Sequence, residues 1–197
     1  MLPPASRWLP AAGLAIACVL VVTLTAQKRA LQSELEASQL ERERPYPGLS
    51  VPEFASRTLS GENVIIAGGM PGDRQILFVF DTACGYCKRT VPVWNRIAGT
   101  LRNIRGVAVY GISLNDEAST RRYVEKMKLT FPVLLFPDPR TARLFRAEVV
   151  PITAMVNSDG VLEHVRLGAL DRAPSAVDSI IDAIRGVSRG GKFEGAK

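Results

Sequence analysis

Two cysteines separated by two residues are the side chains of this sequence best suited to chemistry. Cys84 and Cys87 lie in the stretch FVFDTACGYCKRTVPVW, after a run of apolar residues and before a segment of helical composition. A pair with this spacing can bind a metal, attach a haem, form a structural disulfide, or cycle between dithiol and disulfide. The other residues of the chain decide between these four uses.

The metal and haem alternatives need ligands that the chain does not supply. Structural zinc sites and iron–sulfur clusters are held by four protein ligands, and this sequence contains three cysteines and one histidine. Cys18 lies in an apolar N-terminal segment, and His164 lies far along the chain in a predicted strand. Covalent c-type haem requires a histidine directly after the second cysteine, where this chain has Lys88. We therefore predict that the protein binds no metal and no other cofactor.

A redox cycle agrees better with the local sequence than a structural disulfide does. A disulfide that closes so small a ring removes little chain entropy and stabilises weakly. Cys84 is expected where a strand ends and a helix begins, and the unpaired amides and positive dipole end of that helix lower the pKa of a thiol. We predict that Cys84 attacks the substrate and that Cys87, one turn deeper, resolves the mixed disulfide. Gly85 and Tyr86, which separate the cysteines, are predicted to contact the substrate.

The elements that must position the pair alternate between strands and helices. Apolar runs predict a hairpin over Arg57–Ala67 and strands at Gln75–Asp81, Gly106–Leu114, Pro132–Phe136, Ile152–Asn157 and Val161–Leu167. Helical patterns cover Tyr86–Leu101, Glu117–Lys128, Arg140–Arg146 and Ala173–Arg185. This order predicts an α/β fold with a mixed sheet flanked by helices.

The N-terminal segment is predicted to lie outside the globular domain. Trp8–Ala26 carries no charge over roughly 19 residues, which is long enough for a helix to cross a bilayer. A cleaved signal peptide is disfavoured because Leu24 stands where a small residue is expected before a cut after Ala26. A lipoprotein anchor at Cys18 is also disfavoured, since membrane-type residues follow that cysteine. We therefore predict a single-pass transmembrane helix in contact with the lipid bilayer.

The chain is predicted to have four parts. Residues 1–26 form the transmembrane anchor, 27–48 a juxtamembrane helix and proline-rich linker, 49–188 the globular domain, and 189–197 a disordered tail. Apolar residues make up 47% and charged residues 22% of the chain, which is ordinary for a globular protein. The net charge of +6 comes from scattered basic residues without a nucleic-acid-binding motif, so no nucleic-acid partner is predicted.

Several stretches together resemble a known family. GLSVPEF, LSGENV, QILFVF, CGYCK and VVPITAMVNSDGVL are similar to the membrane-anchored TlpA/ResA-like redoxins of the thioredoxin fold, and to their MauD-like members. The resemblance implies a periplasmic domain that exchanges disulfides with protein substrates and with an upstream membrane or periplasmic electron donor or acceptor. It also implies a cis Val150–Pro151 bond beside Cys84, in a loop that binds the substrate. Reductase, oxidase and isomerase directions all remain open.

The sequence departs from the pattern of these redoxins at several positions. Ala83 stands where many members have a tryptophan before the first cysteine. Phe78 and Thr90 occupy the two positions at which related proteins have a carboxylate that transfers a proton to the resolving cysteine. Asp81 is nearby, and we interpret it as a strand-end or helix-cap residue rather than as the missing acid.

Two other functions remain as alternatives. Peroxiredoxins share the thioredoxin architecture, but they have a proline and a threonine at fixed spacing before the peroxidatic cysteine, where this chain has Leu77 and Asp81. A non-enzymatic, anchored partner-binding module would leave the cysteine pair at a strand–helix junction unexplained. Both alternatives are therefore disfavoured against thiol–disulfide exchange.

Overall fold

The chain forms two units, Met1–Glu43 and Arg44–Lys197. The computed structural model describes residues 20–29, 31–32, 44–170, 178 and 181–182. In the first unit, residues 20–29 and 31–32 are helical. None of the helices formed by the described residues is both long enough and apolar enough to span a membrane.

Several sequence predictions fall on residues outside this description. Residues 1–19 of the predicted anchor, most of the juxtamembrane segment and the whole of the predicted tail 189–197 lie outside it. Of the predicted C-terminal helix, the description covers residues 178, 181 and 182, which are helical. The transmembrane anchor and the disordered tail therefore stay predictions.

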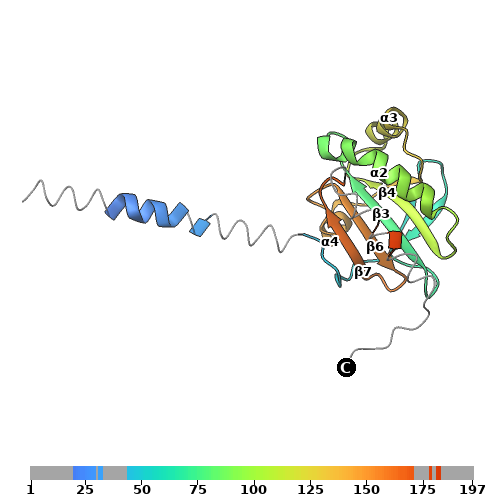
Figure 1. Cartoon of the computed structure of the whole chain (residues 1–197), viewed down its shortest axis with the longest axis horizontal. Helices are drawn as coiled ribbons and strands as arrows, with labels where there is room; N and C mark the ends of the chain where they lie inside the picture. The colour runs from blue at the N-terminus through green and yellow to red at the C-terminus, as the bar shows by residue number, and fades with distance from the viewer. Residues whose placement is uncertain (1–19, 30, 33–43, 171–177, 179–180, 183–197) are drawn as a thin grey trace, which may run out of the picture. The chain divides into compact units, whose positions relative to one another are not determined.

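A mixed five-stranded sheet forms the centre of the second unit (Figure 1), in the order β5-β4-β3-β6-β7. β3 pairs in parallel with β4 and β4 with β5, whereas β6 is antiparallel to both β3 and β7. The predicted α/β fold with a mixed sheet is confirmed. The elements are β1 Phe54–Arg57, β2 Asn63–Ile66, β3 Arg74–Phe80, α2 Gly85–Leu101, β4 Val107–Ser113, α3 Glu117–Met127, β5 Val133–Leu135, α4 Pro139–Leu144, β6 Ile152–Asn157 and β7 Leu162–Leu167.

The N-terminal hairpin differs from its prediction. β1 and β2 pair with each other in a separate two-stranded sheet, in which Phe54 lies opposite Ile66. The sequence prediction began the hairpin at Arg57, which is the last residue of this first strand. The strand starts earlier because the buried ring of Phe54 packs against the rings of Phe136 and Phe145, at centroid distances of 5.7 and 5.6 Å. Such tertiary contacts are not visible in the local pattern of the sequence.

Side chains of β3 alternate between two hydrophobic cores. Ile76, Phe78 and Phe80 belong to the core that also contains the buried faces of α2 and α3. Leu77 and Val79 belong to the other core, which includes residues from β1, β2 and α4. This alternation follows from the two-residue period of a strand, and it buries β3 on both faces. A central strand of this kind gives a rigid support for the turn that follows it.

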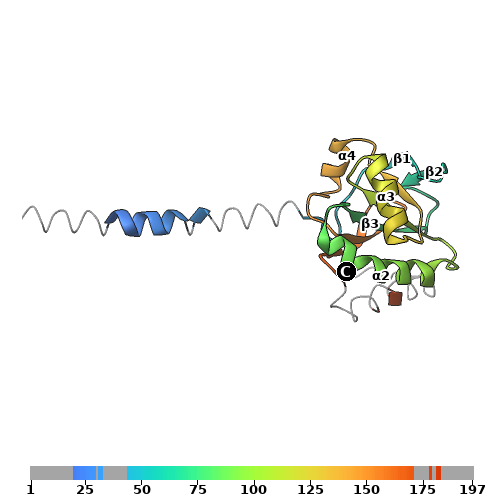
Figure 2. The ribbon, with the colours of Figure 1, turned by 90° about the horizontal axis from the view of Figure 1, so that it is seen from above.

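The longest described helix, α2, begins at the cysteine pair and runs across the sheet; Figure 2 shows it along its length. Its buried residues include Val91, Trp94, Ile97, Ala98 and Leu101, at the spacing of one face of a helix. The predicted helix at residues 86–101 is confirmed. Because this face is buried in the core, the N-terminal turn of α2, which contains the cysteine pair, is held in place.

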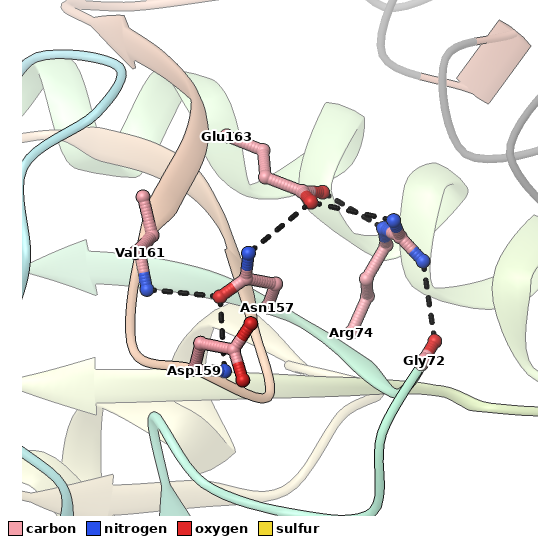
Figure 3. Close-up of polar contacts among 6 residues, drawn as sticks. All are labelled: Gly72, Arg74, Asn157, Asp159, Val161 and Glu163. Atoms are coloured by element: carbon pink, nitrogen blue, oxygen red, sulfur yellow. Dashed lines mark hydrogen bonds and ion pairs between the residues drawn. The ribbon is translucent and has the colours of Figure 1, made fainter. Parts of the chain in front are cut away.

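Polar contacts join β3 to β7 at the end of the sheet where β3 begins (Figure 3). The guanidinium of Arg74 donates to both carboxylate oxygens of Glu163, at 2.7 and 3.3 Å. Asn157, on the intervening strand β6, donates to Glu163 and accepts from the backbone amides of Asp159 and Val161. These contacts hold the turn between β6 and β7, which the sequence also predicts.

Trp94 connects α2 to two strands at once. Its ring stacks on Phe78 of β3, with centroids 5.1 Å apart and planes inclined by 14°. Its indole Nε1–H donates to the hydroxyl of Thr153 on β6, at 2.8 Å. Both partners are buried, so the hydrogen bond has no competition from solvent.

We expect Thr153→Val to destabilise the protein by about 1–3 kcal/mol, because it leaves the buried indole N–H without an acceptor while conserving volume. Thr100→Val is a suitable control, since the Thr100 hydroxyl donates only to the Arg96 carbonyl of its own helix at a less buried position. The free energy of unfolding in urea should fall for the first variant and change by less than about 0.5 kcal/mol for the second. Equal losses in both variants would contradict this role of Trp94.

Candidate active site

The turn that follows β3 places Cys84 at the start of α2. Cys84 is the N-cap residue, with extended backbone angles, and Gly85 is the first residue of the helix. The Asp81 carbonyl accepts from the Cys84 amide at 3.2 Å, and the Asp81 carboxylate accepts from the Ala83 amide at 2.7 Å. The predicted position of Cys84 at a strand–helix junction is therefore confirmed.

Asn115, which follows β4, fixes this turn from the neighbouring strand. Its side-chain oxygen accepts from the Thr82 amide at 2.7 Å, and its side-chain nitrogen donates to the Asp81 carboxylate at 3.1 Å. β3 and β4 are parallel, so their carboxyl ends meet at one edge of the sheet. The sequence analysis missed Asn115, although a polar residue directly after a parallel strand is a recognisable signal for this edge.

The two sulfurs occupy different environments. Both cysteines are free thiols; Cys84 is half-buried, and Cys87 is 0% exposed. The backbone amide of Cys87 donates to Cys84 Sγ at 3.2 Å. The Cys87 amide therefore donates to the sulfur that must carry negative charge when Cys84 attacks a disulfide. The arrangement gives one accessible sulfur with a hydrogen-bond donor and one sheltered sulfur beside it.

Burial raises the pKa of the Cys87 thiol, because a thiolate there would lose its hydration. The hydrogen bond with the Cys84 side chain raises this pKa further, whereas a backbone hydrogen bond at Asp81 acts in the opposite direction. Cys87 therefore stays protonated near neutral pH. Nucleophilic attack by Cys87 needs either a local change or a stabilising partner for its thiolate.

The loop before β6 meets the cysteine pair. The Val150–Pro151 peptide bond is cis, as predicted. The Cys84 thiol lies 3.9 Å from the Val150 carbonyl oxygen, although the two residues are far apart in the sequence. The predicted placement of this loop beside Cys84 is thus confirmed as geometry, while the binding of substrate there stays a prediction.

The two residues between the cysteines lie on the surface. The Tyr86 side chain is 59% exposed, and the Arg89 guanidinium lies 4.5 Å from the centroid of its ring. A Cβ atom added to Gly85 would meet no heavy atom within 4 Å. The packing of the domain therefore leaves room for a side chain at position 85, and the space above it is open to an approaching molecule.

The positions without the expected carboxylate are filled by structural residues. Phe78 lies between Trp94 and Phe131, with ring centroids at 5.1 and 5.0 Å. Thr90 donates to the Tyr86 carbonyl of its own helix at 2.9 Å. Asp81 accepts from amide groups in its own turn and from Asn115, in agreement with its interpretation as a strand-end residue.

A cavity of about 440 Å³ begins at Asn115 and extends towards α4. Phe136, Ala142, Ala147 and Glu148 are among its lining residues. Asn115 belongs to the loop after β4, and Glu148 belongs to the loop before Pro151, two residues before Val150. The cavity therefore reaches both of the loops that flank the cysteine pair. An open, largely apolar hollow at this edge is suited to a side chain of a larger partner.

We expect Cys84 to react with iodoacetamide at least about tenfold faster than Cys87 in the reduced, folded protein near neutral pH. Because its pKa is raised, Cys87 should become reactive only at a pH above that at which an ordinary cysteine ionises. Mass spectrometry of digests would locate the label, and denatured protein, in which both cysteines should react equally, is the control. Equal labelling of the two thiols in the folded state would contradict the division between an attacking and a sheltered sulfur.

Comparisons with known proteins agree with this geometry. The chain is 22% identical over 131 residues to the thiol-disulfide oxidoreductase ResA of Halalkalibacterium halodurans, a match that covers 66% of this chain and 73% of that protein. The crystal structure of StoA from Bacillus subtilis has a TM-score of 0.57 at 18% identity and covers 68% of this chain and 97% of StoA. A secreted Mycobacterium tuberculosis disulfide oxidoreductase homologous to E. coli DsbE has a TM-score of 0.53 at 19% identity, covering 68% and 95%.

These similarities confirm the thioredoxin-like α/β fold and the resemblance to ResA-like proteins. The region from residue 47 to residue 165, more than half of the sequence, matches the AhpC/TSA family. The chain belongs to the AhpC/TSA family.

Proposed function

We propose that this protein is a thiol–disulfide oxidoreductase that exchanges disulfides with protein substrates through Cys84 and Cys87. The observation that carries the proposal is the contrast between the two sulfurs. Cys84 is accessible and accepts a hydrogen bond from the Cys87 amide, whereas Cys87 is buried one turn further along α2. The similar protein of Halalkalibacterium halodurans is named a thiol-disulfide oxidoreductase, which agrees with this proposal.

The proposed reaction has two exchange steps. The Cys84 thiolate attacks one sulfur of a substrate disulfide, which forms a mixed disulfide and releases the other substrate sulfur as a thiolate. The Cys87 sulfur then loses its proton and attacks Cys84 Sγ. A bond forms between the two cysteines, the bond to the substrate breaks, and the substrate leaves as a dithiol. Two electrons pass from the protein to the substrate, and the reverse sequence oxidises a substrate dithiol.

We also propose that Gly85, Tyr86, Val150 and Pro151 bind the substrate chain. The Val150 carbonyl, near Cys84, is an acceptor for a backbone amide of an extended substrate segment. Gly85 leaves open space above the pair, and Tyr86 offers an exposed aromatic face beside it. A substrate side chain that reaches past the Asn115 loop would enter the adjoining cavity.

The first experiment traps the mixed disulfide. In a Cys87→Ser variant, Cys84 should remain joined to protein substrates, because no second sulfur is present to release them. In Cys84→Ser no such species should form, and catalysed exchange should fall to the uncatalysed rate in both variants. Non-reducing electrophoresis followed by mass spectrometry would identify the linked cysteine. Consumption of hydrogen peroxide faster than reduction of protein disulfides would instead favour the peroxidase alternative.

We further propose that the protein is a single-pass membrane protein with its catalytic domain on the extracytoplasmic side. The uncharged segment Trp8–Ala26 supports an anchor, and an oxidising compartment suits disulfide exchange between proteins. The proposal includes an upstream membrane or periplasmic partner that exchanges electrons with the Cys84–Cys87 pair. The similar M. tuberculosis protein is described as secreted, which agrees with an extracytoplasmic setting.

A fusion experiment tests this topology. Alkaline phosphatase joined after Lys197 should be active, because that enzyme works only after export, whereas a fluorescent reporter that works only in the cytosol should stay dark at the same position. The fusion should remain in the membrane fraction after a high-salt wash. Deletion of residues 1–26 is the matched control and should abolish phosphatase activity. Recovery of a soluble, exported domain that lacks these residues would show a cleaved signal peptide instead.

A further inference from the structure

The hydroxyl group of Tyr123 is buried without a partner. Tyr123 lies on the buried face of α3, with an exposed fraction of 5%. Among the side-chain nitrogen and oxygen atoms of the described residues, its hydroxyl oxygen is the one that is buried and makes no hydrogen bond to the protein. Buried tyrosine hydroxyls usually have a partner, because an unpaired one destabilises the fold. Phenylalanine would fill the same place without this penalty, so the hydroxyl calls for an explanation outside stability.

Tyr123 lies in the core that contains the cysteine pair. Its ring stacks on Phe80, with centroids 5.2 Å apart and planes inclined by 22°, and Phe80 is the last residue of β3 before the turn to Cys84. Cys87 is buried in the same core. The groups whose charge acts on the phenol are Cys87, Cys84 and Asp81, all from the end of β3 and the first turn of α2.

We infer that the Tyr123 hydroxyl is the hydrogen-bond donor for the Cys87 sulfur while Cys87 resolves the mixed disulfide. This inference rests on the proposed function and names a further residue for the same reaction. In the dithiol form the Tyr123 hydroxyl makes no hydrogen bond, so the bond to the Cys87 sulfur is one that forms during the reaction. Once Cys87 becomes a thiolate, the phenol O–H can form a charge-assisted hydrogen bond.

The protonation states of the two groups fit these roles. Burial raises the pKa of Tyr123, and negative charge at Cys87, Cys84 and Asp81 raises it further. The phenol therefore keeps its proton across the physiological range and can donate it in a hydrogen bond. Burial also raises the pKa of Cys87, so its thiolate is the species that needs a donor. A fixed donor inside the core lowers the free energy of that thiolate without letting solvent in.

The resolving step balances without a proton from Tyr123. Cys87 S–H loses its proton to solvent, and the resulting thiolate accepts the hydrogen bond from Tyr123 as it attacks Cys84 Sγ. The Cys84–Cys87 bond forms, and the bond from Cys84 to the leaving thiol breaks with its electron pair on that thiol. The Tyr123 hydroxyl has the same proton before and after the step.

The test separates the first exchange step from the second. Full-length protein with Cys18→Ser is reduced and mixed with the chromogenic disulfide dithiobis(nitrobenzoate). The attack of Cys84 releases one coloured thiol, and the attack of Cys87 on the mixed disulfide releases the second. Tyr123→Phe should slow the second release by about 10- to 100-fold, the loss expected for a hydrogen bond to a charged group. The first release should change by less than about twofold. The Cys84 sulfur accepts its hydrogen bond from the backbone amide of Cys87, which the substitution does not change.

The pH dependence adds a measurement that a purely structural role would not change. The second release should become faster with rising pH as Cys87 ionises, and Tyr123→Phe should displace this curve towards higher pH. Besides Cys87 itself, Cys84 and Asp81 are the groups whose charge acts on Tyr123. In the mixed disulfide Cys84 has no thiol left to ionise. Asp81 is the same in the wild type and in Tyr123→Phe, so it cannot cause a difference between their pH curves. Thermal stability should stay the same or rise in Tyr123→Phe, because the substitution removes an unpaired buried hydroxyl and keeps the ring on Phe80.

Tyr110→Phe is the matched control. Tyr110 is a half-buried tyrosine on β4, and burial together with Glu62 raises its pKa, yet none of the cysteines acts on it. Its substitution should leave both release steps unchanged. An unchanged second step in Tyr123→Phe, or equal slowing of both steps, would overturn the inference and leave the proposed function intact. Failure of the wild-type pair to release a second thiol would overturn the proposed function itself.

Discussion

The packing of Trp94 is the interaction on which the arrangement of the site depends. The two halves of the site come from distant parts of the chain, Cys84 from the start of α2 and Val150–Pro151 from the segment before β6. Trp94 stacks on β3 through Phe78 and hydrogen-bonds to β6 through Thr153, two residues after Pro151. A helix joined to both strands cannot slide along either one. The separation between the Cys84 sulfur and the Val150 carbonyl is thereby set in the core, away from the surface where substrates meet the protein.

A second, polar layer sets the orientation of the cysteine pair. Asn115 holds the Asp81 carboxylate and the Thr82 amide, so the turn takes its shape from β4 as well as from its own residues. The N-cap position then directs the Cys87 amide to Cys84 Sγ. The apolar core fixes where α2 begins, and the polar turn fixes which sulfur is presented. The difference in accessibility between two cysteines only three positions apart follows from these two layers together.

The sequence was sufficient for the parts of this site that depend on local order. An apolar run followed by Cys84, Cys87 and a helical pattern predicts the strand–helix junction, because each feature is local. Pro151 could be placed beside Cys84 only through the resemblance to redoxins, since no local pattern brings together residues so far apart. The start of β1 at Phe54 depends on the rings of Phe136 and Phe145, and the sequence analysis missed it for that reason. The membrane anchor remains a prediction from hydrophobicity alone.

Tyr123 shows most clearly why sequence patterns alone are insufficient here. In EASTRRYVEKM it is one apolar-type residue on the inner face of a charged helix, and such a position is normally core. A role for its hydroxyl can be inferred only from the tertiary structure, in which the Tyr123 ring of α3 stacks on Phe80 at the end of β3. There the charges of Cys87 and Asp81 act on the phenol. Burial of Cys87 protects its sulfur from solvent but also opposes the thiolate that the reaction needs. A neutral donor that keeps its proton relieves that opposition without a second charge in the core, whose own desolvation would be costly.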